Sequence, residues 1–416
     1  MIAKASGVET PHSKRSLPDG WRWVRLGEVC EEQTGTRDPR SEALKQFRYV
    51  DITSVDNRTK RMVDPKTLVG REAPSRARQV IRKSDVLVST TRPNLNAVAL
   101  VPSGLDDEIA STGFCVLRPK SALNPSYLFG FVQSAEFVQC LSDLVKGALY
   151  PAVTDKQVRD QFIPLPPLAE QKRIAAILNE QMAVVDRARA AAEVQLEAAK
   201  ALPAAYLRAV FNSQEARQWP RRRLGEVCEL LPSKSIATDG DAEVLAITTA
   251  SLTESGFEPS GVKQARMWAN DVTECVVSPG EILIARSNTP DLVGRVAMFS
   301  GNPKEAVASD LTIRLRGNGD RVNSAFLTAY LSFLYLTGYW KERAGGASGS
   351  MKKITRTQIQ EERVPAPPIS EQGRIAAVLK EQMAVVERTR KALDEQLDTI
   401  TKLPATLLRM AFNGEI

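Results

Sequence analysis

Apolar residues recur every three or four positions along two long segments of the chain, residues 164–212 and 365–413. This spacing is typical of a helix with one apolar stripe. Both segments open with prolines, which suit a helix start, whereas Pro203 and Pro404 are expected to end or kink the helices. About 33 residues at 1.5 Å each predict a rod of roughly 50 Å. We expect the stripe residues to form the seam of a helix pair: Ile174, Leu178, Gln181, Val185, Ile375, Leu379, Gln382 and Val386.

The two stripes imply that the helices pack together, since a helix of this kind is not stable alone in water. If the two halves of the chain are related by a pseudo-twofold axis, the helices pack antiparallel. The amides of Gln181 and Gln382 allow two interpretations. They are buried on the seam, where they set its register, or they sit at its edge. The pattern leaves both open.

The chain also repeats itself. The sequence RLGEVCE occurs at Arg25–Glu31 and again at Arg223–Glu229, and the two long segments are more than half identical to each other. Such a match lies far beyond chance and indicates an internal duplication. A repeated frame that carries unlike inserts predicts two different recognition surfaces.

The inserts, residues 32–163 and 230–364, share only a weak skeleton. It includes the strand-like runs DVLVS and EILIA, followed by AVALV and RVAMF. Strand-like and short helical runs are mixed, so the expected fold class is α+β, with two globular domains separated by two long antiparallel helices in an internal pseudo-twofold repeat. The predicted boundaries are a disordered tail at 1–16, a first domain at 17–163, a first helix at 164–212, a second domain at 213–364 and a second helix at 365–416.

Composition excludes several kinds of chemistry. The single histidine, His12, lies in the predicted tail, so a catalytic triad, a histidine-based zinc site and a histidine general base lack their imidazole. The five cysteines form no CxxC pair, which argues against a disulfide framework or a thiolate metal site. With no membrane-length apolar run and no signal-peptide core, a cytoplasmic protein without membrane contact is expected. The net charge of +7 suggests an anionic partner.

Four pieces of the sequence together resemble the specificity (S) subunit of type I restriction-modification systems. They are LPDGWRWVRLGEV at Leu17–Val29, its second copy WPRRRLGEV from Trp219, the helix starts PPLAEQ and PPISEQ, and the closing AFNGEI. The resemblance covers nearly the whole chain. It lies in the order of the parts, which is motif, variable domain and helix, followed by the same three parts again.

The resemblance implies a non-catalytic, sequence-specific DNA-recognition subunit. In that family each variable domain is a target-recognition domain that reads one half of a bipartite gapped site. The long helices set the gap and dock the methyltransferase (M) subunits. The implied partners are double-stranded DNA, two M subunits and two restriction (R) subunits. No cofactor or metal is implied on this chain, since S-adenosylmethionine belongs to the M subunits, and ATP and Mg to the R subunits.

Two other functions stay open. One is a non-catalytic helical scaffold or interaction protein without sequence-specific DNA reading, which the unlike inserts and the basic balance argue against. The other is an enzyme with a cryptic site, such as a nuclease. The sequence contains no G-x4-GK[ST] phosphate loop, no GxGxxG and no NPPY-like tetrapeptide, which argues against the enzyme.

One group of candidate DNA contacts lies in the first variable domain, in a basic stretch over residues 58–83. Cations suit contacts to phosphates. The alternative is a solvated surface face, which is what most charge runs are. The candidates in this group are Arg76, Arg78, Arg82 and Lys83.

Two further groups of candidates occur in both copies. The loops after the shared strands carry arginine and asparagine, which pair with guanine and adenine in the major groove, unless the prolines there only turn the chain. The segments before the long helices carry small, basic and aromatic residues, which suit phosphate approach or stacking, or else a flexible hinge. The candidates are Arg92, Asn94, Tyr150, Arg286, Asn288, Lys352, Lys353 and Arg356.

Overall fold

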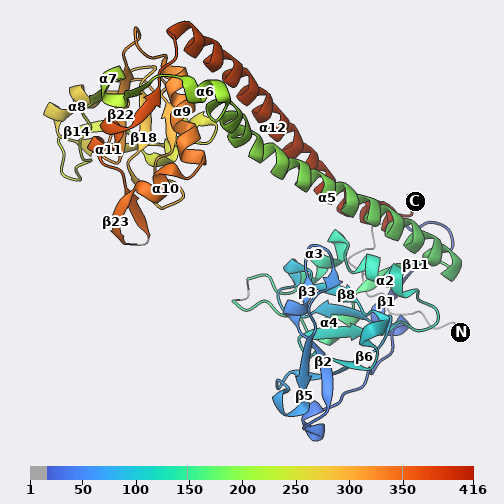
Figure 1. Cartoon of the computed structure of the whole chain (residues 1–416). Helices are drawn as coiled ribbons and strands as arrows, with labels where there is room; N and C mark the ends of the chain where they lie inside the picture. Colours follow the sequence, from blue (N-terminus) through green and yellow to red (C-terminus); the bar gives the residue numbers. More distant parts are fainter. Residues whose placement is uncertain (1–15, 148, 349) are drawn as a thin grey trace, which may run out of the picture. The chain divides into compact units, whose positions relative to one another are not determined.

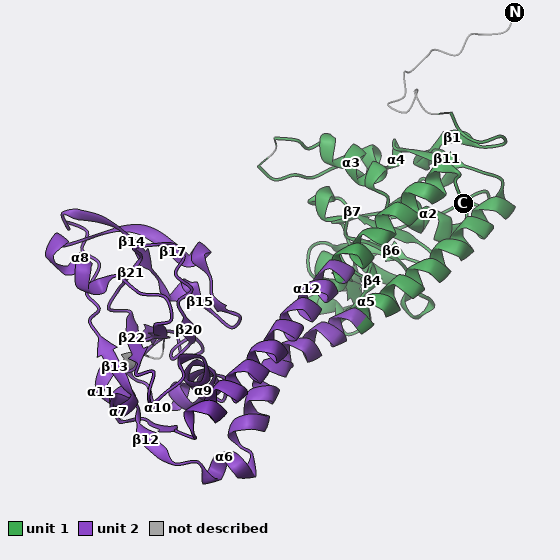
Figure 2. Cartoon of the chain, turned by 90° about the horizontal axis from the view of Figure 1, so that it is seen from above, with its two compact units in different colours: residues 1–191, 397–416 green, residues 192–396 purple. Residues whose placement is uncertain are grey.

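The computed structural model describes residues 16–147, 149–348 and 350–416 of the 416-residue chain. The chain forms two compact units (Figure 2). Unit 1 comprises residues 1–191 and 397–416, and unit 2 comprises residues 192–396. The tail predicted for residues 1–16 lies outside the described residues except for Ser16. Each unit mixes sheets with helices, which confirms the predicted α+β class.

Two long helices, α5 (Leu168–Phe211) and α12 (Ile369–Asn413), are shared between the units (Figure 1). In unit 1 the start of α5 contributes Ile174 to the same core as Phe412 from the end of α12. In unit 2 the start of α12 and the end of α5 share a core in the same manner. Each unit holds the first part of one helix beside the last part of the other, so the helices run antiparallel, as predicted.

Most of the predicted seam residues are buried, but the two amides are not. Gln181 is exposed and Gln382 is half-buried, which favours the interpretation that they lie at the edge of the apolar stripe. The buried members of the set are Ile174, Leu178, Val185, Ile375, Leu379 and Val386.

Of the two expectations for Pro203 and Pro404, that they end or kink the helices, the first is wrong. The helices have 44 and 45 residues, with each proline inside. A proline in a helix interior costs about 3 kcal/mol because it removes one backbone hydrogen bond and crowds the preceding turn. Here the turns beyond the prolines carry core residues, Leu207 and Phe211 in one helix and Leu408 and Phe412 in the other. Burying each of these side chains contributes about 1.5–3 kcal/mol, which offsets that cost.

Unit 1 carries a four-stranded sheet of order β5-β2-β9-β6, a three-stranded sheet of order β10-β7-β8, and the short pairings β1-β11 and β3-β4. The pairings are antiparallel except for β2 with β9. Its elements before α5 are β1 (Arg22–Arg25), α1 (Leu26–Val29), β2 (Gln46–Val50), β3 (Val55–Asp56), β4 (Arg61–Met62), β5 (Lys66–Val69), β6 (Ala77–Ile81), β7 (Val86–Ser89), β8 (Val98–Leu100), β9 (Glu108–Ser111), β10 (Phe114–Leu117), α2 (Pro125–Phe131), α3 (Ala135–Asp143), α4 (Asp155–Arg159) and β11 (Phe162–Leu165).

Unit 2 carries a four-stranded sheet of order β13-β22-β18-β20, three-stranded sheets of order β17-β14-β21 and β19-β24-β23, and the pairings β12-β25 and β15-β16. Only β14 with β21 is parallel among its named strands. Its elements between the long helices are α6 (Gln214–Gln218), β12 (Arg221–Arg223), α7 (Leu224–Val227), β13 (Cys228–Leu231), β14 (Ala242–Ile247), β15 (Leu252–Thr253), β16 (Gly256–Phe257), β17 (Val262–Met267), α8 (Ala269–Cys275), β18 (Ile282–Ala285), β19 (Ser287–Asn288), β20 (Val296–Met298), β21 (Val307–Ala308), β22 (Thr312–Gly317), α9 (Ser324–Leu336), α10 (Tyr339–Arg343), β23 (Gly345–Ser348), β24 (Met351–Lys353), α11 (Arg356–Glu361) and β25 (Arg363–Pro365).

The shared strand-like runs form equivalent strands in the two units, as predicted. DVLVS and EILIA form β7 and β18, each of which is buried along its whole length and lies between two antiparallel neighbours. The runs that follow form β8 and β20, which pair with them. A strand buried on both faces reads as a continuous apolar run, which is why these two pieces stand out in otherwise divergent sequence.

The repeated RLGEV motif lies where the first strand of each globular domain pairs with its last strand. Strand β1 before the motif pairs with β11, and β12 pairs with β25, so the segment that begins each domain lies beside the segment that ends it. The Leu26 N–H donates to the Gln161 carbonyl at 2.9 Å, and the Leu224 N–H donates to the Glu362 carbonyl at 2.8 Å. The motif is thus a structural clasp at the base of each variable domain.

A buried glutamine fixes the start of each long helix to its domain. Gln171 accepts a hydrogen bond from the Asn124 N–H at 2.8 Å and donates to the carbonyls of Ala122 and Pro166 at 3.0 and 2.9 Å. Gln372 repeats the arrangement in unit 2 with the equivalent segment before α9. Both glutamines are 1% exposed. This explains the second polar residue of the EQ pair in the repeated helix start.

Replacing Gln171 with leucine is expected to lower the free energy of unfolding by about 1–3 kcal/mol, because a buried N–H and two carbonyls lose their partner. Chemical denaturation of the purified protein measures the change. The matched control is Gln181→Leu on the same helix, where the side chain is exposed and a change within about 0.5 kcal/mol is expected. Equal losses in the two variants would contradict the role of Gln171.

Candidate nucleic-acid interface

In unit 1, two segments far apart in sequence are hydrogen-bonded together just beyond the buried strand β7. The Val153 N–H donates to the Thr90 carbonyl at 2.8 Å, and the Arg92 N–H donates to the Pro151 carbonyl at 2.8 Å. We call this arrangement the joint of unit 1. It places Arg92 and Asn94, predicted from the loop after the strand, beside the segment that carries Tyr150.

Unit 2 has the same joint beyond β18. The Ile354 N–H donates to the Arg286 carbonyl at 2.9 Å, and β19 pairs with β24 so that Asn288 lies opposite Lys352. Here too the loop after the strand lies beside the segment before the long helix. Of the predicted candidates, the joint of unit 2 therefore brings together Arg286, Asn288, Lys352 and Lys353.

The two joints are equivalent position by position. Val153 is followed at once by a capping box, in which Thr154 and Gln157 satisfy the first turn of α4. Ile354 is followed by the same box at the start of α11. Counting back three residues from Val153 and from Ile354 makes Tyr150 the counterpart of Met351. One backbone frame thus presents different side chains in the two units.

The loop of unit 1 is held in an unusual backbone conformation. Arg92 and Asn96 have φ values of 50° and 48°, in the left-handed region that non-glycine residues rarely occupy. Such residues persist where their surroundings hold them, and they are frequent at functional sites. The side chains of Arg92 and Asn94 are exposed. The loop therefore presents a guanidinium and an amide on a fixed backbone.

The basic stretch of unit 1 is divided by strand β6. Arg76 precedes the strand, and its carbonyl accepts a hydrogen bond from the Thr112 N–H. The next residue, Gly113, accepts a hydrogen bond from the Thr90 N–H, so Arg76 lies near the joint. Arg82 and Lys83 follow the strand, roughly 20 Å further along at about 3.3 Å per residue. Arg78 lies between them, half-buried and 3.1 Å from the Asp38 carboxylate. The four predicted cations do not form one cluster.

The start of the basic stretch lines a different feature. Lys60 and Arg61 contribute to a cleft of about 420 Å³ in unit 1, with α5 on its other side. There Lys60 donates to the Asn96 carbonyl at 2.6 Å, and Arg61 lies 3.6 Å from Asp186 of α5. Burial lowers the pKa of Lys60 to about 8. These two cations are engaged with unit 1 itself.

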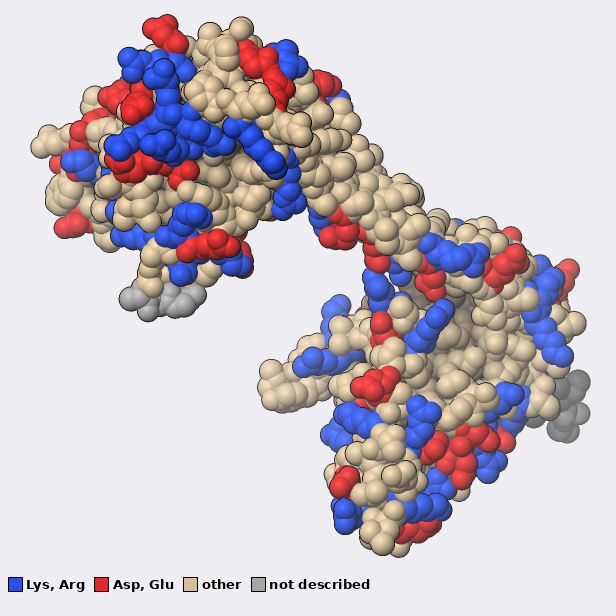
Figure 3. Space-filling view, in the orientation of Figure 1, with Lys and Arg blue, Asp and Glu red and all other residues tan. Residues whose placement is uncertain are grey.

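Arg356 has a structural task in unit 2. Its guanidinium donates to the carbonyls of Leu230 and Leu231 at 2.9 Å each, which fastens α11 to the end of β13. Burial, followed by the positive charges of Arg286 and Arg314, lowers the pKa of Arg356 from its ordinary value. Lys353 is exposed, whereas Lys352 and Arg286 are half-buried. Figure 3 shows that cations are spread over the visible face of both units, with carboxylates among them.

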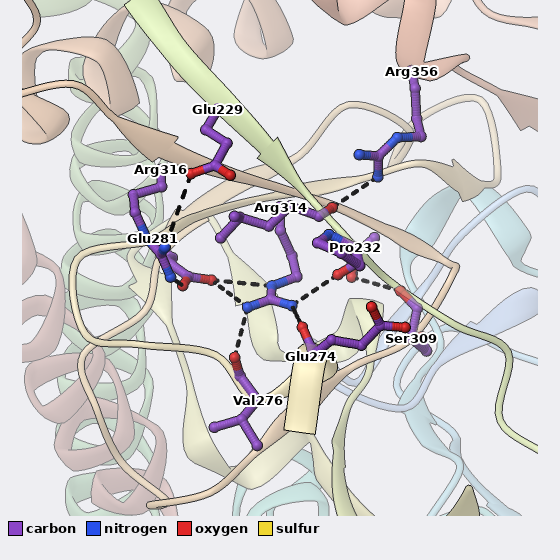
Figure 4. Close-up of polar contacts among 11 residues, drawn as sticks. Glu229, Pro232, Glu274, Val276, Glu281, Ser309, Arg314, Arg316 and Arg356 are labelled. Carbon is purple, nitrogen blue, oxygen red and sulfur yellow. Dashed lines mark hydrogen bonds and ion pairs between the residues drawn. The ribbon is translucent and has the colours of Figure 1, made fainter. Parts of the chain in front are cut away.

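A buried ion pair lies at the start of β18, the strand that leads into the joint of unit 2 (Figure 4). The Arg314 guanidinium bonds the Glu281 carboxylate at 3.0 Å, and both residues are 1% exposed. Its remaining N–H groups donate to the carbonyls of Pro232, Glu274 and Val276 at 2.8, 2.7 and 2.6 Å. One side chain thus ties the residue before β18 to two other segments, the end of β13 and the end of α8, and fixes the strand that leads into the joint.

Unit 1 has a related pair in which the equivalent acid, Asp85, bonds Arg118, the counterpart by strand register of Arg316 and not of Arg314. Arg118 donates to both carboxylate oxygens of Asp85 at 2.8 and 2.7 Å, and to the carbonyls of Thr34 and Val80 at 3.1 and 3.3 Å. The hydrogen bond with Asp85 raises the pKa of Arg118. Neither pair was among the predicted site residues. The available signal was the acidic residue that heads each shared strand-like run, DVLVS and EILIA.

The described residues offer few groups for other chemistry. All five cysteines are unpaired thiols, and burial raises the pKa of Cys30 and of Cys228 to about 12. Among the described residues, no group of three His, Cys, Asp or Glu side chains could hold a metal ion. In the same part of the chain, no helix is long and apolar enough to cross a membrane. His12 lies outside the described residues.

Comparison with known proteins gives consistent relatives. The chain is 24% identical over 429 residues to the type I restriction enzyme StySPI specificity subunit of Salmonella potsdam, which covers 97% of this chain and 91% of that protein. It is also 24% identical over 433 residues to the EcoKI specificity subunit of Escherichia coli K12, with the same coverage of both.

Solved structures agree over nearly the full length. The crystal structure of the HsdS subunit from Thermoanaerobacter tengcongensis is 32% identical, with a TM-score of 0.68, and the match covers 98% of this chain and all of that one. A second solved structure is 32% identical, with a TM-score of 0.80. It is described as the structural basis underlying complex assembly and conformational transition of the type I R-M system, and the match covers 96% of this chain and 100% of that one.

The family model described as type I restriction modification DNA specificity domain matches the chain twice, at residues 18–186 and 216–397. Each match contains one clasp, one joint and the start of one long helix. The two matches together span most of the sequence and coincide with the internal repeat. The chain therefore belongs to the family of type I restriction-modification specificity subunits.

Proposed function

We propose that this chain is the non-catalytic subunit that reads DNA sequence in a type I restriction-modification complex, with each unit recognising one half of a bipartite gapped site in double-stranded DNA. The observation that carries the proposal is the pair of equivalent joints. They share one backbone frame and differ in the side chains they present, as reading two unlike half-sites requires.

The chemistry of the side chains at the two joints supports this assignment. In unit 1 the joint presents Arg92 and Asn94, which can pair with guanine and adenine edges in the major groove. In unit 2 it presents Asn288 with Lys352 and Lys353, which suit a base edge and neighbouring phosphates. Contacts of this kind give binding that weakens steeply with salt.

The proposal assigns the remaining parts of the complex to other chains. Two M subunits would carry S-adenosylmethionine and methylate adenine, and two R subunits would use ATP and Mg. The helices α5 and α12 would set the gap between the half-sites and dock the M subunits. This chain would bind no cofactor and would work in the cytoplasm.

Methylation-sensitive sequencing of host DNA, with the gene present and with it deleted, tests the function. A bipartite gapped adenine-methylation motif is expected to disappear on deletion and to return when the gene is restored. An intact gene for the M subunit, confirmed by its protein level, is the control. A motif that persists after deletion would contradict the specificity role.

A further inference from the structure

The loop between α3 and α4 carries two adjacent apolar side chains that are exposed. Leu149 is 86% exposed and Tyr150 is 85% exposed, more than any other large apolar residue in the described part of the chain. Single exposed apolar residues are ordinary, but two adjacent ones at the end of a loop indicate a surface that is covered in a complex. In Figure 1 this loop, which follows α3, projects from the body of unit 1.

The base of this loop is the joint itself. The Pro151 carbonyl accepts from the Arg92 N–H, and Val153 is bonded to Thr90, so the chain is fixed immediately after Tyr150. The exposed pair therefore leaves unit 1 directly beside the loop that carries Arg92 and Asn94. Whatever lies against those two side chains also lies within reach of Leu149 and Tyr150.

Unit 2 places an apolar side chain at the equivalent position. Met351, the counterpart of Tyr150, is 46% exposed and is the first residue of β24, which pairs with β23 as a hairpin. This hairpin also projects from its unit in Figure 1. The two projecting segments, which we call the tips, have unrelated sequences. Each nevertheless carries an apolar residue three positions before the joint residue, Val153 or Ile354.

Charge indicates the kind of partner that covers the tips. Between Leu144 and Thr154 the only charged residue is Lys146, and between Ala344 and Thr355 the only charged residues are Lys352 and Lys353. Neither tip contains a carboxylate, although 49 of the 416 residues are acidic. An apolar end flanked only by cations suits a polyanion with an apolar interior, which describes a DNA duplex and its stacked bases.

We propose that the two tips are wedges that enter the base stack, with Leu149 and Tyr150 acting at one half-site and Met351 at the other. This rests on the function proposed above. Leucine and methionine are among the side chains that unstack base steps, and tyrosine stacks on an exposed base. Unstacking costs a few kcal/mol per step, and the lysines on the flanking phosphates help to offset it. Each half-site would then favour a flexible step, such as TA or CA, at the wedge.

Fluorescence of 2-aminopurine tests the wedges, because it rises when the base loses its stacked neighbours. The probe replaces each adenine of the half-sites in turn, in a duplex bound by the full chain together with its methyltransferase partner. The wild-type complex is expected to give a rise at one position or more in each half-site. The double variant Leu149→Ser, Tyr150→Ser should abolish the rise in one half-site only, and Met351→Ser should abolish it in the other only.

Affinity provides the second measurement. Loss of a stacked aromatic and its neighbour is expected to weaken binding at least about tenfold. A mismatch placed at the wedge step should restore most of that loss, because the step is already unstacked. Leu44→Ser is the matched control, since Leu44 is 79% exposed in unit 1 but lies on a loop outside the joint, and it should leave both signals unchanged.

The possible outcomes distinguish failure of the wedge proposal from failure of the proposed function. If the wild-type complex binds its site specifically without any rise in fluorescence, the wedge is wrong and the proposed function stands. If no specific binding is found, the proposed function itself fails. If the double variant instead loses its methyltransferase partner, the tip of unit 1 docks a protein and the wedge is overturned.

Discussion

A chain in which residues 32–163 are replaced by a second copy of residues 230–364 is expected to direct methylation to a palindrome. Both units would then present the same joint, and the pseudo-twofold repeat would relate two identical readings. The asymmetric motif should disappear completely, and an inverted repeat of the half-site read by unit 2 should replace it. Methylation-sensitive sequencing of DNA from cells that carry the exchanged gene measures the result.

The structure indicates that the transplanted domain will fold in its new place, because the helices offer it the same side chains. Phe412 packs edge-on against Tyr127 and Phe131 of α2 at 5.2 and 5.3 Å, and Phe211 makes the equivalent contacts with α9 of unit 2. The other matched residues on the helices are Ile174 with Ile375, Leu178 with Leu379, Leu408 with Leu207 and Gln171 with Gln372.

The reciprocal exchange is the control for this experiment. A chain with two copies of residues 32–163 should methylate the inverted repeat of the other half-site. One half-site from each palindrome, placed together, must give the asymmetric motif of the natural chain. A palindrome that contains any base pair absent from the natural half-sites would show that the units do not read DNA independently.

Replacing Glu281 with alanine is expected to destabilise unit 2 by about 3–5 kcal/mol, because the guanidinium of Arg314 stays buried without its counter-ion. A typical domain is stable by only about 5–15 kcal/mol, so much of unit 2 should be unfolded at physiological temperature. Chemical denaturation of the purified chain should show an early transition, and recognition of one half-site should be lost while the other is kept.

Glu229→Ala provides the comparison. Glu229 also faces an arginine, Arg316, at 3.9 Å, but both side chains are more than half exposed. An exposed pair of this kind contributes about 0–1 kcal/mol. If Glu281→Ala were no more harmful than Glu229→Ala, the buried pair would not be what fixes the start of β18.

The broad architecture could be predicted from the sequence because its signals are local or repeated. The apolar stripes gave the helices, the internal match gave the twofold arrangement, and the continuous apolar runs gave β7 and β18. The extent of the helices was not predictable by the same means. Whether a helix survives Pro203 or Pro404 depends on what the following turn packs against, and those partners lie in distant parts of the chain.

The candidate interface shows the same division. Arginine and asparagine after a buried strand, and lysine before a helix, could be singled out by residue type. That Arg92 meets Pro151, or Asn288 meets Lys352, depends on strand pairing across long stretches of divergent sequence. Arg356 was singled out as a DNA contact because it is a cation, and only the structure reveals the two carbonyls that occupy it.

The described part of the chain begins and ends at the same place in unit 1. A side chain added at Gly414 would overlap the ring of Pro18, so the two termini of the folded part are adjacent. A circularly permuted chain, closed here by a short linker and opened between α5 and β12, would keep every strand pairing and every helix contact described above. Either half could then be synthesised first. The order of the halves along the gene is not a requirement of the fold.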